Sequence, residues 1–194
     1  MHDPKELWQA ARDGDLARLR ALLASGVDVE HPHWGWTPLY YAACNGHTAC
    51  LEALLATGAS VHSVHSSAMD GWTPLHCASF EGHAACVCAL ISAGAVVNRT
   101  DRRGNTPFYH ALNRGHCRVL KILLRAGADV QRIGRAARWY ANTSAWALVD
   151  EIRAAGGWQN YATRRRAALV RAFSGKVSKY VSAHIISFEP PGGD

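Results

Sequence analysis

Short amphipathic segments alternate with polar loops along the first two thirds of the chain. Three of these segments carry apolar residues at positions i, i+3 and i+4, which places them on one face of a helix. The three stripes are Leu51, Leu54 and Leu55, then Val87, Leu90 and Ile91, then Leu120, Leu123 and Leu124. A shorter apolar segment precedes each stripe. The pattern predicts helix pairs, with a first helix near 37–45, 73–81 and 106–114 and a second near 47–57, 83–93 and 116–126.

The first helix of each pair opens with the same short motif. Thr-Pro occurs at 37–38, 73–74 and 106–107, each time two residues after a glycine. A threonine hydroxyl can accept from the unpaired amides of a first helical turn, and proline has no N–H to leave unpaired there. The threonines lie 36 and 33 residues apart. A helix pair that recurs at this period predicts a stack of repeats that grows along one axis.

This motif at this period resembles the ankyrin repeat family. The most complete copy is Gly71-Trp72-Thr73-Pro74-Leu75-His76, and the others begin at Gly35 and Gly104. The resemblance implies an all-α ankyrin repeat solenoid of helix-turn-helix units with short β-hairpin connections. The residues after it predict a basic helical extension. We expect a repeat domain at 1–157, with units at about 1–31, 32–67, 68–100, 101–130 and 131–157. The first and last units are degenerate and act as caps.

The units depart from the family pattern at several positions. In the first unit Thr-Pro is replaced by Lys5-Glu6, and a second helix is predicted at 16–23. The fifth unit has a first helix near 134–141 and a second near 147–155. The family's histidine is present at His76, whereas tyrosine stands at this position in both neighbours. The aspartate that opens the hairpin is present at Asp101 and replaced by Pro32 in the second unit.

A basic extension occupies residues 158–194. The apolar spacing in 159–173 predicts one more helix, and 176–188 fits a helix and a strand equally well. The basic side chains of this extension are Arg164, Arg165, Arg166, Arg171, Lys176 and Lys179. They form either a solvated helix face or a site for an acidic partner.

The net charge of +6 is unevenly distributed. Residues 31–98 contain no lysine or arginine, whereas residues 99–181 contain 17 of them and four acids. Such a basic segment favours acidic partners, whether protein, nucleic acid or lipid headgroups.

The N-terminal sequence and the cysteines predict a compartment. The first 20 residues carry eight charged side chains and no long apolar run, so we expect no signal peptide. No stretch has the length and apolarity needed to span a bilayer. The six cysteines therefore predict reduced thiols in the cytoplasm. The arginine run leaves the nucleus as an alternative location.

The resemblance implies that partners bind the concave wall formed by hairpin tips and first helices. The register places these side chains on that wall: His33, Trp34, Trp36, Met69, Asp70, Trp72, Phe80, Glu81, Arg102, Arg103, Asn105, Asn113 and Arg114. Aromatic residues form its middle and arginines lie beside them, which are the residue types enriched at binding hot spots. We expect a partner protein with apolar and acidic contact residues. The alternative is that Trp36 and Trp72 pack inside the repeats.

Eleven histidines and six cysteines raise the question of a metal site. His83, Cys86 and Cys88 have a ligand-like spacing, but His47, His83 and His116 all start a second helix, which is a usual position for histidine in the family. No second cluster completes the four ligands of a zinc site. There is also no glycine-rich phosphate loop and no nucleophile with an orienting partner at a telling spacing. We expect no metal, no cofactor and no enzymatic activity.

The sequence thus predicts a non-enzymatic protein–protein interaction module, as an adaptor, a scaffold or a stable subunit of a larger assembly. One alternative is a substrate adaptor of a ubiquitin ligase, since some ankyrin repeat proteins carry a cullin-recruiting box after the repeats. That box contains a cysteine, and none follows Cys117. A second alternative is a nucleic-acid-associated regulator that uses the C-terminal arginines, whose binding would depend strongly on salt.

Overall fold

The computed structural model describes residues 5–64, 71–130 and 143–173, and the regular elements in these ranges are helices. They are α1 Lys5–Asp13, α2 Leu16–Ala24, α3 Pro38–Asn45, α4 Thr48–Ala56, α5 Pro74–Glu81, α6 Ala84–Ser92, α7 Pro107–Arg114, α8 Cys117–Arg125, α9 Thr143–Ala154 and α10 Trp158–Phe173. The described part of the chain also contains one isolated antiparallel bridge, between His33 and Trp36. None of the described helices is long and apolar enough to cross a membrane.

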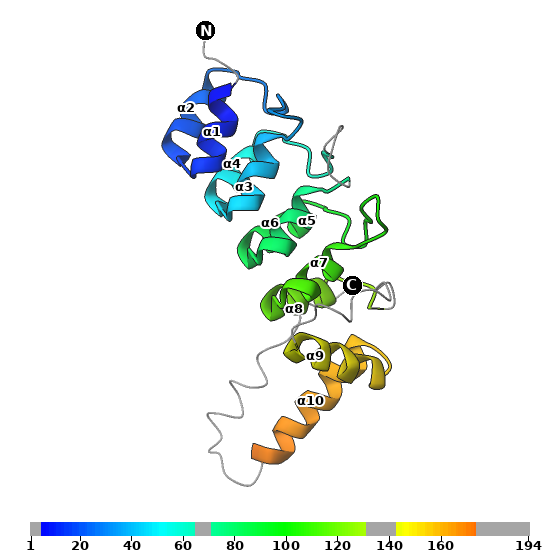
Figure 1. The fold of residues 1–194 in the computed structure, drawn as a ribbon. Coiled ribbons are helices and arrows are strands. Elements are labelled where there is room, and N and C mark those ends of the chain that lie inside the picture. Colours follow the sequence, from blue (N-terminus) through cyan, green and yellow to red (C-terminus); the bar gives the residue numbers. More distant parts are fainter. Residues whose placement is uncertain (1–4, 65–70, 131–142, 174–194) are drawn as a thin grey trace. The chain divides into compact units, whose positions relative to one another are not determined.

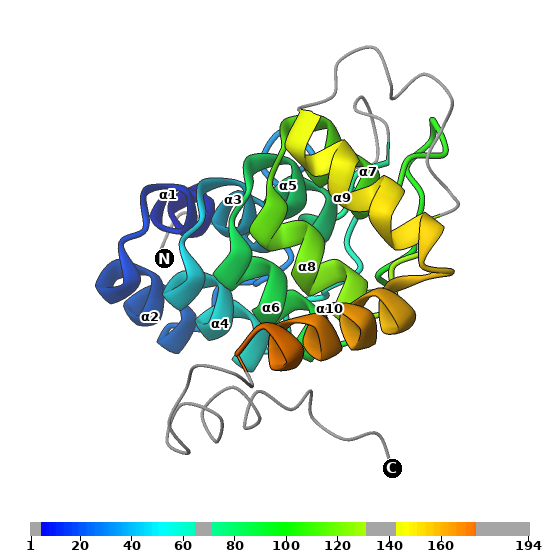
Figure 2. The same cartoon turned by 90° about the horizontal axis from the view of Figure 1, so that it is seen from below.

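The chain divides into two compact parts, residues 1–148 and 149–194. In the first part, α1 to α8 form four successive helix pairs, which we number as repeat units one to four (Figure 1). Helices α1, α3, α5 and α7 pack side by side in one row, and α2, α4, α6 and α8 form a second row (Figure 2). We refer to the first row as the inner helices and to the second as the outer helices. The all-α stack of repeated pairs that the sequence predicted is confirmed.

The inner helices begin where the Thr-Pro motif predicted. Thr37, Thr73 and Thr106 are the N-caps of α3, α5 and α7, and each hydroxyl accepts a hydrogen bond from the N–H three residues later. At Thr73 the cap is reciprocal, because the His76 side chain accepts from the Thr73 N–H at 3.2 Å. The boundaries of these helices are therefore set by local sequence.

Seven of the nine residues in the predicted apolar stripes are buried between the two rows, whereas Leu55 and Ile91 are half-buried. Leu51 and Leu54 of α4 and Leu120 and Leu123 of α8 have no exposed surface. Val87 and Leu90 of α6 are equally buried. Each stripe therefore attaches its outer helix to the inner row. Burial of such a side chain contributes about 1.5–3 kcal/mol.

Histidines at the start of the outer helices connect neighbouring units. Each histidine donates from Nε2 to a backbone carbonyl at the end of the inner helix of the preceding unit. The distances are 2.9 Å for His47, 3.0 Å for His83 and 2.8 Å for His116. Each ring lies against the glycine that ends that helix, so a Cβ added to Gly82 would approach the His116 ring to 2.6 Å. The histidines therefore contribute to stacking through both a hydrogen bond and a close contact.

Two cysteines differ from expectation. Cys44 and Cys77 form a disulfide, so the prediction of six reduced thiols is wrong for this pair. They lie 33 residues apart, and the stacking of α3 on α5 brings their Cα atoms to 5.2 Å, within the usual range for a disulfide. The free thiols are those of Cys50, Cys86, Cys88 and Cys117. The bond links two neighbouring inner helices covalently.

The C-terminal elements match the prediction in part. Helix α9 begins at Thr143, four residues before the predicted start, and α10 spans nearly the predicted 159–173. The buried side chains of residues 149–194 include Val149, Ile152 and Tyr161. The predicted helix at 134–141 and the segment 176–188 lie outside the described residues, and the limits of the individual repeat units stay predictions.

Candidate functional site

The candidate residues belong to the inner helices of residues 1–148 and to the hairpins that precede them. We name this surface the inner face, and define it by hairpins 33–36 and 101–105 together with the outward side chains of α1, α3, α5 and α7. Met69 and Asp70 fall in 65–70, outside the described residues. The structure describes the other eleven predicted contact residues.

Trp34 occupies the tip of the first hairpin. His33 and Trp36 exchange two backbone hydrogen bonds, of 2.9 and 3.0 Å, around a two-residue turn. Both turn residues have positive φ, 54° at Trp34 and 81° at Gly35, as in a type I′ turn. The Trp34 residue is 82% exposed. The hairpin therefore presents a large indole to solvent.

The hairpin of the fourth unit closes differently. There the Asp101 N–H donates to the Asn105 carbonyl over 2.8 Å, which encloses three residues instead of two. Pro32 occupies the equivalent position in the second unit and has no N–H to donate. Pairing in the second unit therefore starts one residue later, at His33, and this shorter turn places Trp34 at positive φ.

An aromatic group that the sequence did not predict supports the first hairpin. The Trp8 and His33 rings stack at 3.9 Å with an interplanar angle of 8°. Tyr41 lies 5.4 Å from Trp8 and its hydroxyl donates to the His33 carbonyl over 3.2 Å. The Arg12 guanidinium lies 5.2 Å from the centroid of the Trp8 ring. A sequence signal existed, because Trp8 and Tyr41 lie one repeat period apart on neighbouring inner helices.

Two tryptophans are partly covered by packing within the repeats. Trp36 is half-buried and stacks on Tyr40 at 3.8 Å. Trp72 is also half-buried, with its ring 5.2 Å from Phe80 and 4.4 Å from His110. The Trp72 Nε1 is buried and has no hydrogen-bond partner among the described residues. Both indoles thus combine a packing role with a partly exposed surface.

Three exposed arginines lie on the fourth unit. Arg102 and Arg103 belong to its hairpin, and Arg114 ends α7 with its guanidinium 4.5 Å from the Phe80 ring centroid. The contact joins Arg114 to the aromatic group of Trp72, Phe80 and His110. Glu81 is exposed beside them and Asn113 is half-buried. Asn105 is half-buried too, and its side-chain amide donates to Asp101 over 3.3 Å.

A buried carboxylate holds the arginine-bearing hairpin in place. Asp101 is 5% exposed and accepts from the Arg103 and Asn105 N–H groups over 2.9 and 2.8 Å. Its other oxygen is 3.0 Å from the His110 Nε2. Burial alone would raise the pKa of Asp101, but these hydrogen bonds outweigh it and the pKa is lowered. The charged form therefore holds the hairpin at neutral pH.

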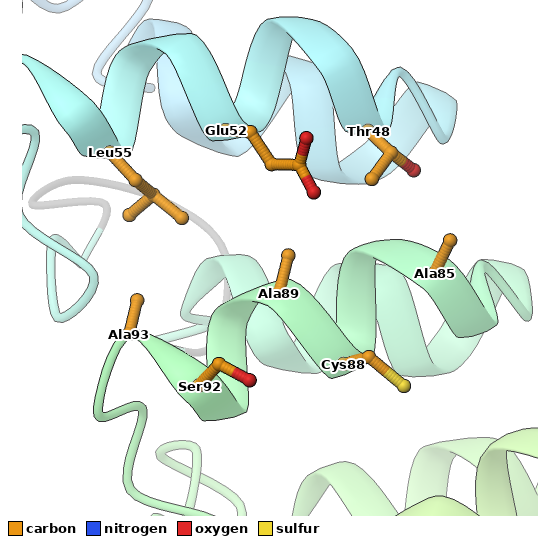
Figure 3. A pocket seen from close by; sticks show the side chains of 8 residues that line it. All are labelled: Thr48, Glu52, Leu55, Ala85, Cys88, Ala89, Ser92 and Ala93. Carbon is orange, nitrogen blue, oxygen red and sulfur yellow. The ribbon is translucent and has the colours of Figure 1, made fainter.

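The described residues offer little that resembles a catalytic or metal site. No group of three or more histidine, cysteine or acidic side chains within them could hold a metal ion. A groove of about 570 Å³ runs between the outer helices α4 and α6 (Figure 3). Small side chains form most of its wall, and its ionisable groups are the Glu52 carboxyl and the Cys88 thiol.

The comparisons with known proteins agree with the fold. A family model described as "Ankyrin repeats (3 copies)" matches residues 7–101 and 62–134, which together cover more than half of the chain. The chain belongs to the ankyrin repeat family. A comparison with curated proteins found no match. Ankyrin repeats bind other proteins, so the repeat domain is a protein–protein interaction module.

The second basic group lies on α10. Arg164, Arg165 and Arg166 are exposed, and Arg165 donates to the Tyr161 hydroxyl. The side chain of Arg171 and both predicted tail lysines, Lys176 and Lys179, lie outside the described residues. This cluster is thus described for three of its six members.

Proposed function

We propose that the protein is a non-enzymatic adaptor or scaffold that binds a partner protein on the inner face of its repeats. The observation that supports this proposal is the exposure of Trp34, Arg102, Arg103 and Arg114 on the hairpins and an inner helix of one repeat stack. Exposed tryptophan and arginine are the side chains that contribute most to interface hot spots. The outer helices α4 and α6 present mainly small side chains by comparison.

The inner face is well ordered before any partner binds. The Cys44–Cys77 disulfide joins α3 to α5, and histidine hydrogen bonds join each described unit to the next. Asp101 fixes the hairpin that carries Arg102 and Arg103. A preorganised surface loses little conformational entropy on binding, so more of the contact energy appears as affinity.

The chemistry of the inner face defines the partner. Carboxylates on the partner would pair with the three arginines, and apolar side chains would cover Trp72 and Phe80. The partner therefore combines acidic and apolar contact residues. We expect a cytoplasmic complex, with the nucleus as the alternative, and the protein is a candidate for a permanent subunit of it. Disulfides are uncommon in such reducing compartments. The number of free thiols in the protein therefore also tests this location.

Site-specific cross-linking tests the proposal. A photoreactive p-benzoylphenylalanine replaces Arg103 on the inner face or, as a control, Lys121, which is exposed on the outer helix α8. We expect one protein to cross-link in high yield from position 103 and not from 121. Absence of any such product from position 103 would contradict the proposal.

Charge removal then tests the arginines with the purified cross-linked partner. Arg103→Ala with Arg114→Ala removes two positive charges from the inner face, and Arg118→Ala with Lys121→Ala removes two from α8. Close charge pairs at interfaces couple by about 1.5 kcal/mol or more, so we expect at least a tenfold loss of affinity for the first pair. The second pair should change the affinity less than twofold. Equal losses would show that net charge matters and the inner face does not.

The basic helix α10 supports a second candidate function. Arg164, Arg165 and Arg166 are exposed together and could bind nucleic acid phosphates. Such binding would weaken steeply with salt, with a slope set by the number of phosphate contacts. Titration with a labelled duplex at several salt concentrations tests it, and charge reversal at the three arginines should abolish binding. The ubiquitin-ligase adaptor function has no described residue in its favour.

A further inference from the structure

We propose that Trp34 is the main anchor of this interface, and that the partner is a folded domain with an apolar pocket that encloses the indole. The proposal rests on the proposed function and adds to it the anchoring residue and the shape of the partner. Three features of the first hairpin carry it: the exposure of the indole, the conformation of its backbone, and its position relative to the arginines.

The exposure of Trp34 is exceptional within the described part of the chain. Trp34 and Val96 are the exposed large apolar residues there, at 82% and 53%. The Trp34 ring lies 5.8 Å from the His33 ring, centroid to centroid, and most of the residue stays accessible to solvent. A tryptophan buries roughly 150–250 Å² when it is enclosed. An extended peptide can cover one face of a protruding ring, so removing most of this area from water requires a pocket.

The backbone at Trp34 is unfavourable for its side chain. Its φ of 54° is the one positive value for a residue other than glycine in the described part of the chain. Turns with two positive φ values favour Asn-Gly, and a bulky residue at the first position is strained. Asparagine would remove the strain and the exposed ring together. An aromatic residue kept in a strained, exposed conformation indicates a function for the ring itself.

Pro32 is responsible for this geometry. Because it has no N–H, the pairing seen at Asp101 and Asn105 in the fourth unit cannot form, and the shorter turn brings Trp34 to the tip. The stacked Trp8 and the Tyr41 hydroxyl then hold His33, the residue before the indole. The hairpin thus positions the anchor as well as carrying it.

The position of the anchor specifies the partner further. Residues 31–98 carry no lysine or arginine, so the first hairpin itself adds no positive charge. Arg12 of α1 lies beside Trp8, whereas three exposed arginines lie on the fourth unit. Two inter-helix spacings, roughly 16–20 Å, separate the inner helices of the second and fourth units. The partner should therefore present an apolar pocket and an acidic surface at about this separation.

Substitution of Trp34 distinguishes the anchor proposal from the more general proposal that a partner binds the inner face. The purified partner identified by cross-linking from position 103 is titrated with the full chain and with Trp34→Asn, Val96→Ala, and Arg103→Ala with Arg114→Ala. For Trp34→Asn we expect at least a 30-fold loss of affinity, which is the hot-spot threshold. Its melting temperature should rise or stay equal, because Asn-Gly suits the turn. Val96→Ala should bind like the parent chain.

A second variant keeps the ring and changes its position. Pro32→Asp restores the N–H and carboxylate that close the hairpin of the fourth unit, so Trp34 should leave positive φ. We expect a 3- to 30-fold loss of affinity with the indole still present. Parent-like binding by this variant would show that the turn does not position the ring.

The outcomes distinguish the two proposals. If Trp34→Asn binds like the parent chain while the double arginine variant is weakened, the anchor proposal is overturned and the proposed function stands. If neither variant is weakened, both fail. Partner cross-links that map to an unstructured peptide would contradict the inference that a folded pocket encloses the indole. A lower melting temperature for Trp34→Asn would contradict the inference that the backbone at Trp34 is strained.

Discussion

The contact between Gly82 and His116 gives a stringent test of how the units stack. Gly82 ends α5 with φ +84°, and an added Cβ would lie 2.6 Å from the His116 ring. Gly94 follows α6 in the same unit with nearly the same φ, +88°, and has nothing within 4 Å of that position. The two glycines thus share the conformational cost of alanine and differ in the contact with the next unit.

The expected magnitudes follow from these two terms. Alanine at positive φ costs about 1–2 kcal/mol, which both variants incur. Gly82→Ala also displaces the His116 ring, whose Nε2 donates to the Phe80 carbonyl over 2.8 Å. Loss of that bond and an unpaired carbonyl add about 1–3 kcal/mol. We expect Gly82→Ala to lower the free energy of unfolding by about 2–5 kcal/mol and Gly94→Ala by about 1–2 kcal/mol, so the first value exceeds the second by about 1–3 kcal/mol.

Urea unfolding at pH 7.5, followed by circular dichroism, measures both values at constant m. A double-mutant cycle isolates the ring contact. In a His116→Ala background the clash cannot occur, so Gly82→Ala should cost no more than Gly94→Ala. Equal costs for the two glycine variants in the parent chain, or additive effects of Gly82→Ala and His116→Ala, would refute the stacking role of the histidine.

Three further predictions concern the interior of the repeats. Ser79 is fully buried in α5 and its hydroxyl has no hydrogen-bond partner among the described residues; Ser79→Ala should therefore raise the free energy of unfolding by about 1 kcal/mol, and a loss in urea melts would contradict this. Burial and the nearby His110 lower the pKa of His76 to about 4. Its neutral form is favoured in the fold, so stability is full above pH 6.5 and falls between pH 6.5 and 4, by about 2 kcal/mol at pH 5; His76→Gln should flatten this part of the pH profile. A thiol assay in denaturant without reductant should find four reactive cysteines, and six after reduction; six in both would show that Cys44 and Cys77 are not bonded.

The helix pairs could be predicted because their signals are local. A Thr-Pro cap marks the start of an inner helix and a glycine marks its end, and a stripe at i, i+3 and i+4 marks an outer helix. Each of these signals lies within about ten residues of sequence. The period also predicts that Trp34, Arg103 and Arg114 share one face, and the structure shows that all three are exposed. Their role as a binding site stays a prediction.

Features that depend on contacts between units were not predicted. The stacking of Trp8 on His33 joins two units, and no local pattern reports it. The Cys44–Cys77 bond needs the stacking of α3 on α5, although a separation of one repeat period was a usable clue. The conformation of Trp34 follows from the missing N–H of Pro32, whose effect appears only in comparison with Asp101.

Hydrogen exchange on the full chain, alone and with the cross-linked partner, tests the inner face most directly. The account predicts slower exchange in hairpins 33–36 and 101–105 and around Arg114, and unchanged exchange in the outer helices α6 and α8. Protection confined to the outer helices or to α10, with the two hairpins unchanged, would contradict it.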